Sequence, residues 1–403
     1  MMHRHNQSVI FLISCLVLCS CTETSSLPEQ SSEPISETVN TDVNENRLAT
    51  HAAVRGGFAA YYSSDDIYYV DSKVSLVNIE NNNLRKAVLC AQTGCTHSDE
   101  TCNAFLSSGL QECILYRGVW YFTVYDRGSA SFKSLDQKTG ERKTYLEFKA
   151  SQDSSHTLSL GGCTGGNAYV YYMENTFDSN YRQFGKDSIL KIDLNTGKEE
   201  EILSWSADAY ESWSYLGGYE NRILLMHSYS AEVIPFDEWE GTQEDYQNYL
   251  SSLESCIELV IFDTESLSQT VIAGNDDSDM IAPSEPSISF GQYFVLPFGD
   301  AVRRYDITTC EYTEILEHSG IINYFIYDAK VFWLVRNDHL ELWCADLDGS
   351  NERQLENPDN YMTFGIDRES KDLFFGYTDH GECLIKKQDF YDGRYDRAFP
   401  AGN

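Results

Sequence analysis

The chain has 403 residues, of which 63 are acidic and 29 basic, and its formal net charge at pH 7 is −34. A surface this acidic repels phosphate, and the sequence shows no cluster of Lys and Arg, so the composition argues against nucleic-acid and anionic-lipid partners. The same charge favours solubility and cationic partners.

The first 20 residues have the pattern of an export signal. His3 and Arg4 precede an apolar run over 9–18, which is too short to span a bilayer but suits a signal-peptide core. Residues 18–21, Leu-Cys-Ser-Cys, resemble the lipobox of bacterial lipoproteins, and the resemblance implies cleavage before Cys21 and lipidation of that residue. The alternative is a plain secretory signal that happens to end in cysteine. Either pattern predicts an exported protein.

Residues 21–52 are predicted to be a lipidated cysteine followed by a disordered tether. The segment is rich in Ser, Thr, Glu and Asn and has almost no large apolar residues, so it cannot bury enough surface to offset chain entropy. Its root-mean-square reach is roughly 30 Å. No later segment has the length and apolar character of a membrane span. We therefore expect membrane contact through the N-terminal lipid only, on the outer face of the cell membrane.

Residues 53–403 repeat one pattern and are predicted to form a single domain. An apolar and aromatic strand core occurs seven times, at 67–70, 119–122, 169–172, 223–226, 293–296, 331–334 and 373–376. About one strand later, a polar residue closes a strand and opens a turn: Asn78, Asp136, Asp193, Asp263, Asp306 and Asp346. Because these residues recur with the repeat, we interpret the aspartates as turn formers and not as catalysts.

One complete copy is legible in residues 319–357. Four short runs rich in aromatic and β-branched residues, at 321–327, 331–336, 339–345 and 352–355, are separated by turn residues. A four-stranded sheet of this kind has two apolar faces, so copies must stack radially to bury them. The predicted fold class is all-β: a β-propeller of four-stranded antiparallel blades with one short helical insertion. Seven blades are expected, six or eight are the alternatives, and the end copies can share strands to close the ring.

The connection between the first two copies is rich in cysteine. Cys90, Cys95, His97 and Cys102 fall within thirteen residues, and Cys113 follows. Three cysteines and a histidine can supply the ligands of a tetrahedral zinc site. An exported protein favours a disulfide instead, and four cysteines allow three pairings. Free buried thiols are the third alternative.

The same stretch, LCAQTGCTHSDETCNAF, resembles a segment of β-propeller lipoproteins of Gram-positive bacteria. These proteins are similar to TolB-type propellers and are of unknown function. With the lipobox, the tether and the repeats, the resemblance covers most of the chain. It implies a surface lipoprotein with a propeller head, and it implies no activity.

An insertion in the fourth copy predicts a short amphipathic helix. Thr242 and Asp245 have the spacing of a capping box. Apolar residues then recur at helical intervals, at Tyr246, Tyr249, Leu250 and Leu253. Such a helix either packs on its own blade or forms a lid over a ligand.

A second long loop is expected at 273–286. Its acidic residues, Asp276, Asp277 and Asp279, can supply oxygen ligands for Ca²⁺. The spacing differs from that of an EF-hand loop, so a solvated acidic loop is the alternative.

Linear catalytic motifs are absent from the sequence, which has no GxSxG, HExxH or phosphate-binding glycine loop. Most of its 27 Tyr, 20 Phe and 6 Trp fall in strand cores, so Trp205, Trp213 and Trp239, outside them, are the candidate ligand contacts. We expect a monomeric, surface-anchored binding or scaffolding module for a protein, peptide or glycan, without a resident cofactor. The alternative is an extracytoplasmic carbohydrate-active enzyme with acidic residues converging at the propeller channel.

Overall fold

The computed structural model describes residues 60–400, apart from 64–65, 81–82, 152–153, 178–182, 207–210, 231–232, 235–238, 275–288, 299–300, 337–339, 356–364 and 379–380. The predicted signal peptide, Cys21 and the tether lie outside the described residues, as do the acidic-loop residues Asp276, Asp277 and Asp279. Within the described part of the chain, no helix is long and apolar enough to cross a membrane.

Consecutive strands form seven antiparallel sheets, which we call blades 1 to 7. Blade 1 holds β1 (Ala60–Ser63), β2 (Ile67–Val70), β3 (Val74–Glu80) and β4 (Asn83–Val88). Blade 2 holds β5 (Leu110–Tyr116), β6 (Val119–Asp126), β7 (Ser129–Asp136) and β8 (Arg142–Phe148). Blade 3 holds β9 (Ser154–Thr164), β10 (Asn167–Phe177), the extra β11 (Gln183–Phe184), β12 (Lys186–Asp193) and β13 (Glu199–Ser206).

The remaining four blades follow the same order. Blade 4 holds β14 (Glu211–Tyr219), β15 (Arg222–Ser230), β16 (Ser255–Asp263) and β17 (Ser268–Ala273), and blade 5 holds β18 (Ser289–Phe290), β19 (Tyr293–Phe298), β20 (Ala301–Asp306) and β21 (Glu311–Glu317). Blade 6 holds β22 (Ile321–Tyr327), β23 (Lys330–Arg336), β24 (Leu340–Asp346) and β25 (Arg353–Leu355). Blade 7 holds β26 (Gly365–Glu369), β27 (Leu373–Thr378), β28 (Gly381–Lys386) and β29 (Phe399–Pro400).

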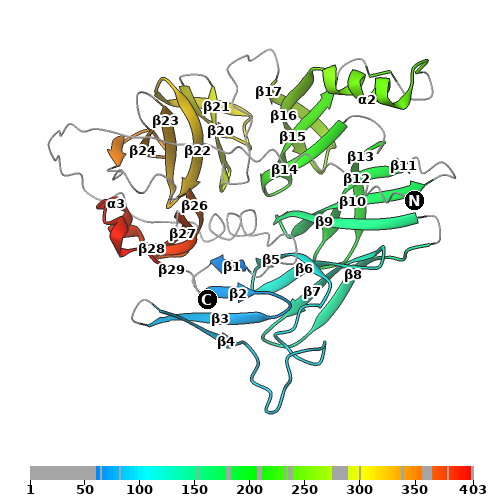
Figure 1. Cartoon of the computed structure of the whole chain (residues 1–403), viewed down its shortest axis with the longest axis horizontal. Helices are drawn as coiled ribbons and strands as arrows, with labels where there is room; N and C mark the ends of the chain where they lie inside the picture. The colour runs from blue at the N-terminus through cyan, green and yellow to red at the C-terminus, as the bar shows by residue number, and fades with distance from the viewer. Residues whose placement is uncertain are drawn as a thin grey trace.

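The blades are arranged in a ring, and blade 7 lies beside blade 1 (Figure 1). The seven-bladed fold is confirmed, which excludes six and eight blades. All seven predicted strand cores lie in the second strand of their blade. The ring closes without a shared strand, because β1–β4 belong only to blade 1 and β26–β29 only to blade 7.

Side chains fill the space between neighbouring blades. Each junction contains a buried apolar cluster, as expected when sheets with two apolar faces stack around an axis. The junction between blades 7 and 1 is held by Val77 of blade 1 and four buried residues of blade 7, Leu373, Phe375, Leu384 and Phe399. Packing therefore performs the closure that a shared strand would otherwise provide.

The predicted turn aspartates end the third strands of blades 2 to 6. The carboxylate of Asp136 accepts the backbone N–H groups of Lys138 (2.8 Å) and Thr139 (3.1 Å). Asp193 and Asp263 accept the corresponding pairs of N–H groups in their own turns. These hydrogen bonds lower the pKa of all three carboxyl groups because they stabilise the charged form.

The helical insertion is confirmed. Helix α2 (Gln243–Ser252) begins after Thr242, whose side chain accepts the N–H of Asp245 while the Asp245 carboxylate accepts the N–H of Thr242. Blade 7 has a further short helix, α3 (Lys387–Tyr391), and a 3-10 turn, η2 (Tyr395–Arg397), where the other blades have a tight turn between their last two strands.

The depressed pKa values of the turn aspartates predict acid sensitivity. An unfolded aspartate has a pKa of about 3.9, so these groups stabilise the fold above that pH and lose this effect as the pH falls through their lower folded values. We expect the melting temperature to fall between about pH 5 and pH 2. An Asp263→Asn variant should be roughly 1 kcal/mol less stable than the native protein at pH 7 and nearly equal to it at pH 2.

Melting curves of both proteins across this range check the prediction. Asp396→Asn, a change at an exposed residue of η2, is the matched control. A constant difference between Asp263→Asn and the native protein at every pH would contradict it.

Candidate functional site

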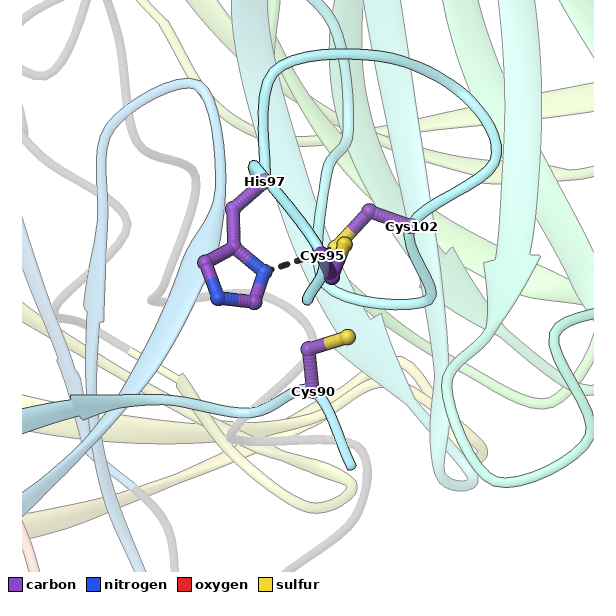
Figure 2. A group of neighbouring side chains, drawn as sticks. All are labelled: Cys90, Cys95, His97 and Cys102. Carbon is purple, nitrogen blue, oxygen red and sulfur yellow. Dashed lines mark hydrogen bonds between the residues drawn. The ribbon is translucent and has the colours of Figure 1, made fainter. Parts of the chain in front are cut away.

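The connection between β4 and β5 brings four predicted site residues together. The ligand atoms of Cys90, Cys95, His97 and Cys102 all lie within 4.8 Å of one another, and we call this group the Cys/His cluster. Figure 2 shows the four side chains turned toward one another, with Cys90 entering from the end of β4. The connection lies at the outer edge of the ring between blades 1 and 2 (Figure 1).

Short turns and one arginine hold the cluster in place. The backbone N–H of Cys95 donates to the carbonyl of Gln92 (3.3 Å), and that of Cys102 donates to Asp99 (3.1 Å). Arg142, the first residue of β8, donates to the carbonyls of Glu100 (3.1 Å), Cys102 (2.9 Å) and Phe105. Blade 2 therefore fixes the second half of a connection that starts on blade 1.

The three thiols of the cluster differ in their hydrogen bonds, pKa and burial. His97 Nδ1 lies 3.3 Å from Cys102 Sγ, which also accepts the backbone N–H of Ala104 at 3.3 Å. The backbone N–H of Gln92 lowers the pKa of Cys90, and the two other thiols add to this effect. The backbone N–H of His97 favours the Cys95 thiolate, but burial and the two neighbouring sulfurs outweigh it and raise the pKa of Cys95 to about 11. Cys102 is buried and the other three are half-buried.

Cys113, the fifth predicted residue, is not part of this cluster. It lies on β5 and packs in the apolar core between blades 1 and 2, beside Val70 and Trp120. The structure therefore separates one core cysteine from three clustered ones. All nine described cysteines are free thiols in this structure, so the disulfide, metal and free-thiol alternatives remain predictions.

The three candidate tryptophans lie in two places. Trp213 on β14 and Trp205 on β13 belong to the core between blades 3 and 4, whereas Trp239 packs on Tyr246 and Tyr249 of α2. Trp213 is only 8% exposed, which corrects the expectation that it presents an open surface. Trp213 is buried because of strand register: it pairs with His227 on the face of blade 4 that meets blade 3.

His227 has partners that the sequence did not reveal. Its ring stacks on Trp213 with centroids 3.9 Å apart, and its two nitrogens face Glu211 (3.0 Å) and Glu258 (3.4 Å). All three partners lie on strands of blade 4, so the group is a polar network within one blade. It depends on cross-strand register and leaves no motif in the linear sequence.

A groove lies at the junction of blades 7 and 1, and we call it the seam groove. It has a volume of about 740 Å³. Its lining residues are Ile79, Lys371, Asp372, Leu373, Lys386, Lys387, Gln388 and Phe399. Three of these eight residues are lysines and one is an aspartate, so the lining has more basic than acidic residues although the sequence as a whole is acidic.

The lysines of the seam groove have different roles. Lys387 Nζ contacts carboxylate oxygens of Asp328 and Glu369, both at 2.8 Å, and is therefore neutralised and fixed. Lys371 and Lys386 are exposed. Pairing of Leu373 with Lys386 in the β27–β28 hairpin brings the two lysines to one end of blade 7. The adjacent lysines at 386 and 387 are the only linear signal, and the contribution of Ile79 from blade 1 required knowledge of ring closure.

No protein-family model and no curated protein sequence matches the chain. Similar solved structures include a prolyl endopeptidase, with 10% identity, a TM-score of 0.44, and 90% of this chain and 50% of that chain covered. The β-propeller domain of the Trilobed protease from Pyrococcus furiosus shares 11% identity, with a TM-score of 0.40 and coverage of 84% and 98%. TolB from Acinetobacter baumannii shares 11% identity, with a TM-score of 0.29 and coverage of 72% and 61%.

The chain spans half the length of the prolyl endopeptidase that it matches. The matched part of the Trilobed protease is itself described as a β-propeller domain. The seven-bladed fold rests on the strand pairing described above.

The contacts of Arg142 predict a local defect when it is replaced. An Arg142→Ala variant leaves three backbone carbonyls without their donor and should lower the free energy of unfolding by roughly 1–3 kcal/mol. Hydrogen exchange of residues 100–105 should accelerate relative to the blades. Urea unfolding and exchange mass spectrometry measure both effects.

Arg127→Ala is the matched control, because the Arg127 side chain is 95% exposed. Unchanged exchange at 100–105 in Arg142→Ala would show that the arginine does not hold the connection.

Proposed function

We propose that this protein is a surface-anchored lipoprotein whose β-propeller is a monomeric binding or scaffolding module for a protein, peptide or glycan. In this proposal a lipid on Cys21 holds the chain on the outer face of the cell membrane, and residues 22–52 form the tether. The observation that carries the binding role is the seam groove, a concave site with an apolar floor and exposed lysines.

The size and lining of the seam groove suit part of an extended ligand. Its volume of about 740 Å³ falls within the range of small-ligand sites, roughly 300–1,000 Å³. Ile79, Leu373 and Phe399 provide apolar contact, and the polar groups around them can orient a ligand. A short stretch of peptide or one or two sugar residues is of the right size.

The charge of the groove favours an anionic group on the ligand. The protein as a whole is strongly acidic, but the seam groove is lined by two exposed lysines, Lys371 and Lys386, against one exposed carboxylate, Asp372. Lys387 also lines the groove, but its charge is paired with Asp328 and Glu369. We therefore propose that the ligand presents a carboxylate or a similar anion to Lys371 and Lys386.

The alternative proposal is that the protein is a carbohydrate-active enzyme. A glycosidase of the common type needs two carboxyl groups, one of them with a raised pKa, roughly 5–10 Å apart. Burial raises the pKa of Asp187 on β12, which is one such group among the described residues. Among the described residues we assign no second carboxyl group as the catalytic partner of Asp187. We therefore propose binding and not catalysis.

Binding at the seam groove predicts a specific loss on charge reversal. The full-length protein is screened against anionic and neutral cell-wall glycans and against acidic and neutral peptides. A Lys371→Glu, Lys386→Glu double variant should bind the anionic hits at least tenfold more weakly, and added salt should weaken native binding. Calorimetry or surface plasmon resonance measures the affinities.

Lys138→Glu, Lys198→Glu is the matched control, because it makes the same charge change at exposed turn lysines of blades 2 and 3. Equal loss in both double variants would show a nonspecific charge effect. Hits that neither variant weakens would place binding elsewhere on the propeller, and a screen without hits would count against the binding role itself.

Anchoring predicts a change in fractionation. A Cys21→Ala variant has no thiol to acylate, so it should leave the membrane fraction, whereas Cys113→Ala should stay with the membrane. Detergent partitioning and mass spectrometry of the N-terminal peptide report the change. An acylated N-terminus in Cys21→Ala, or soluble native protein, would contradict the anchor.

A further inference from the structure

We propose that the Cys/His cluster is a structural zinc site that closes the connection between blades 1 and 2. The ligand atoms are the Sγ atoms of Cys90, Cys95 and Cys102 and the Nδ1 atom of His97. The inference is independent of the proposed binding role, because it rests on the outer edge of the ring and not on the seam groove.

The spacing of the four donor atoms fits one tetrahedral ion. Zinc binds sulfur at about 2.3 Å and imidazole nitrogen at about 2.0–2.1 Å, so ligand atoms around one zinc ion lie roughly 3.5–4 Å apart. All four donor atoms lie within 4.8 Å of one another, and His97 Nδ1 is 3.3 Å from Cys102 Sγ. A small inward movement brings all four to bonding distance of a common centre.

The chemistry of the donors selects zinc over harder ions. Three thiolates and an imidazole are soft and borderline ligands, whereas Ca²⁺ and Mg²⁺ prefer oxygen. The four protein ligands complete a tetrahedron and leave no open position, which is the arrangement of a structural and not a catalytic zinc site. On binding, the three thiols release their protons to solvent and the imidazole coordinates in its neutral form.

A disulfide accounts for fewer of these contacts. It would join two sulfurs and leave the third thiol and the imidazole in the same small space without a bonding partner. His97 adopts φ +55°, a left-handed conformation that eight other non-glycine residues of the described chain share. Its Nδ1 atom lies 3.3 Å from Cys102 Sγ, and a zinc ion would use both atoms as ligands.

Outer contacts resemble those of a metal site. Cys102 Sγ accepts the N–H of Ala104, and such hydrogen bonds to ligating sulfur orient the ligand and disperse its charge. The side chain of Cys102 is 1% exposed, so one ligand is anchored in protein while the half-buried ones leave a path for the ion. Arg142 binds the Cys102 carbonyl and places a positive charge near a centre that carries three thiolates.

The connection needs such a cross-link. It runs through residues 89–109 without a helix or strand of its own, longer than the roughly 12–15 residues usual for an unsupported loop. Its first residue is tied to blade 1, where Leu89 N–H donates to the Val74 carbonyl (3.1 Å). Its second half is tied to both blades: Leu106 N–H donates to the Ser72 carbonyl and Phe105 forms a bridge with Lys73 of blade 1, and Arg142 of blade 2 binds the carbonyl of Glu100. A metal ion would join the first part of the loop, at Cys90, to the last part, at Cys102.

The test begins with the metal content of the full-length protein. After dialysis against metal-free buffer, we expect about one zinc ion per chain by inductively coupled plasma mass spectrometry. Cys102→Ala should retain at least tenfold less zinc. Cys113→Ala, which removes an equally buried cysteine outside the cluster, should retain the native amount. His97→Gln should lose zinc to a competing chelator at a concentration at least tenfold lower than the native protein does.

A second measurement uses the native sequence, so it does not depend on how the variants fold. Zinc is removed under reducing conditions and Co²⁺ is added; thiolate-to-cobalt charge transfer and the visible bands of tetrahedral cobalt should appear. Alkylation of Cys90 and Cys95 should be slow in the zinc form and fast after chelation.

Three results would overturn the proposal. The first is native protein without zinc in which non-reducing peptide mapping links two cluster cysteines. The second is reduced protein that binds neither Zn²⁺ nor Co²⁺. The third is equal zinc content in Cys102→Ala and Cys113→Ala.

Discussion

The structure depends on one constraint: a four-stranded blade has two apolar faces and only another blade can cover each of them. Trp120, Phe262, Phe294 and Trp333 are fully or almost fully buried although each lies on a separate sheet. Such side chains contribute roughly 1.5–3 kcal/mol each on burial, but only when the neighbouring blade is present. The ring is therefore cooperative at every junction, and no blade is a stable unit alone.

The junction that closes the ring satisfies this constraint with few buried apolar residues. The junction of blades 7 and 1 has five buried apolar residues, whereas a single continuous cluster joins blades 4, 5 and 6. As at the other junctions of the described blades, each sheet is complete on its own side, so this junction can remain open at one end without breaking a sheet. The seam groove occupies that position, lined by Ile79 of blade 1 and by Leu373 and Phe399 of blade 7. Because fewer side chains pack at this junction, it is weaker and leaves room for a ligand.

Local features of the fold were predictable because they depend on short sequence separations. The second strands follow from runs such as residues 331–334, the turns from Asp193 and its neighbours, and helix α2 from Thr242 and Asp245. Register and burial were less accessible. Trp213 is buried because it pairs with His227 on a face that meets blade 3, and the sequence does not say which face that is. The separation of Cys113 from the cluster has the same cause, since its strand turns it into the core.

The two candidate sites differ in how far the sequence predicts them. The difference again depends on how far apart their residues lie in the sequence. The Cys/His cluster was visible because its members are close in sequence, and only its geometry required coordinates. The seam groove was not, because Ile79 and Lys371 meet only when the last blade reaches the first.

These two sites flank blade 1 on opposite sides. Its first strand, β1, has four residues and pairs only with β2 within its sheet, and it is the first described strand after the segment 22–52 proposed as the tether. Any pull on a lipid-anchored chain would enter the ring through β1. The seam to blade 7 resists that pull through its buried apolar side chains and through the attraction between Lys86 of blade 1 and Glu382 of blade 7. A zinc ion in the Cys/His cluster would hold the other side of blade 1 to blade 2 through bonds that do not depend on apolar burial. The proposed metal site thus lies where a tethered propeller has most need of a cross-link.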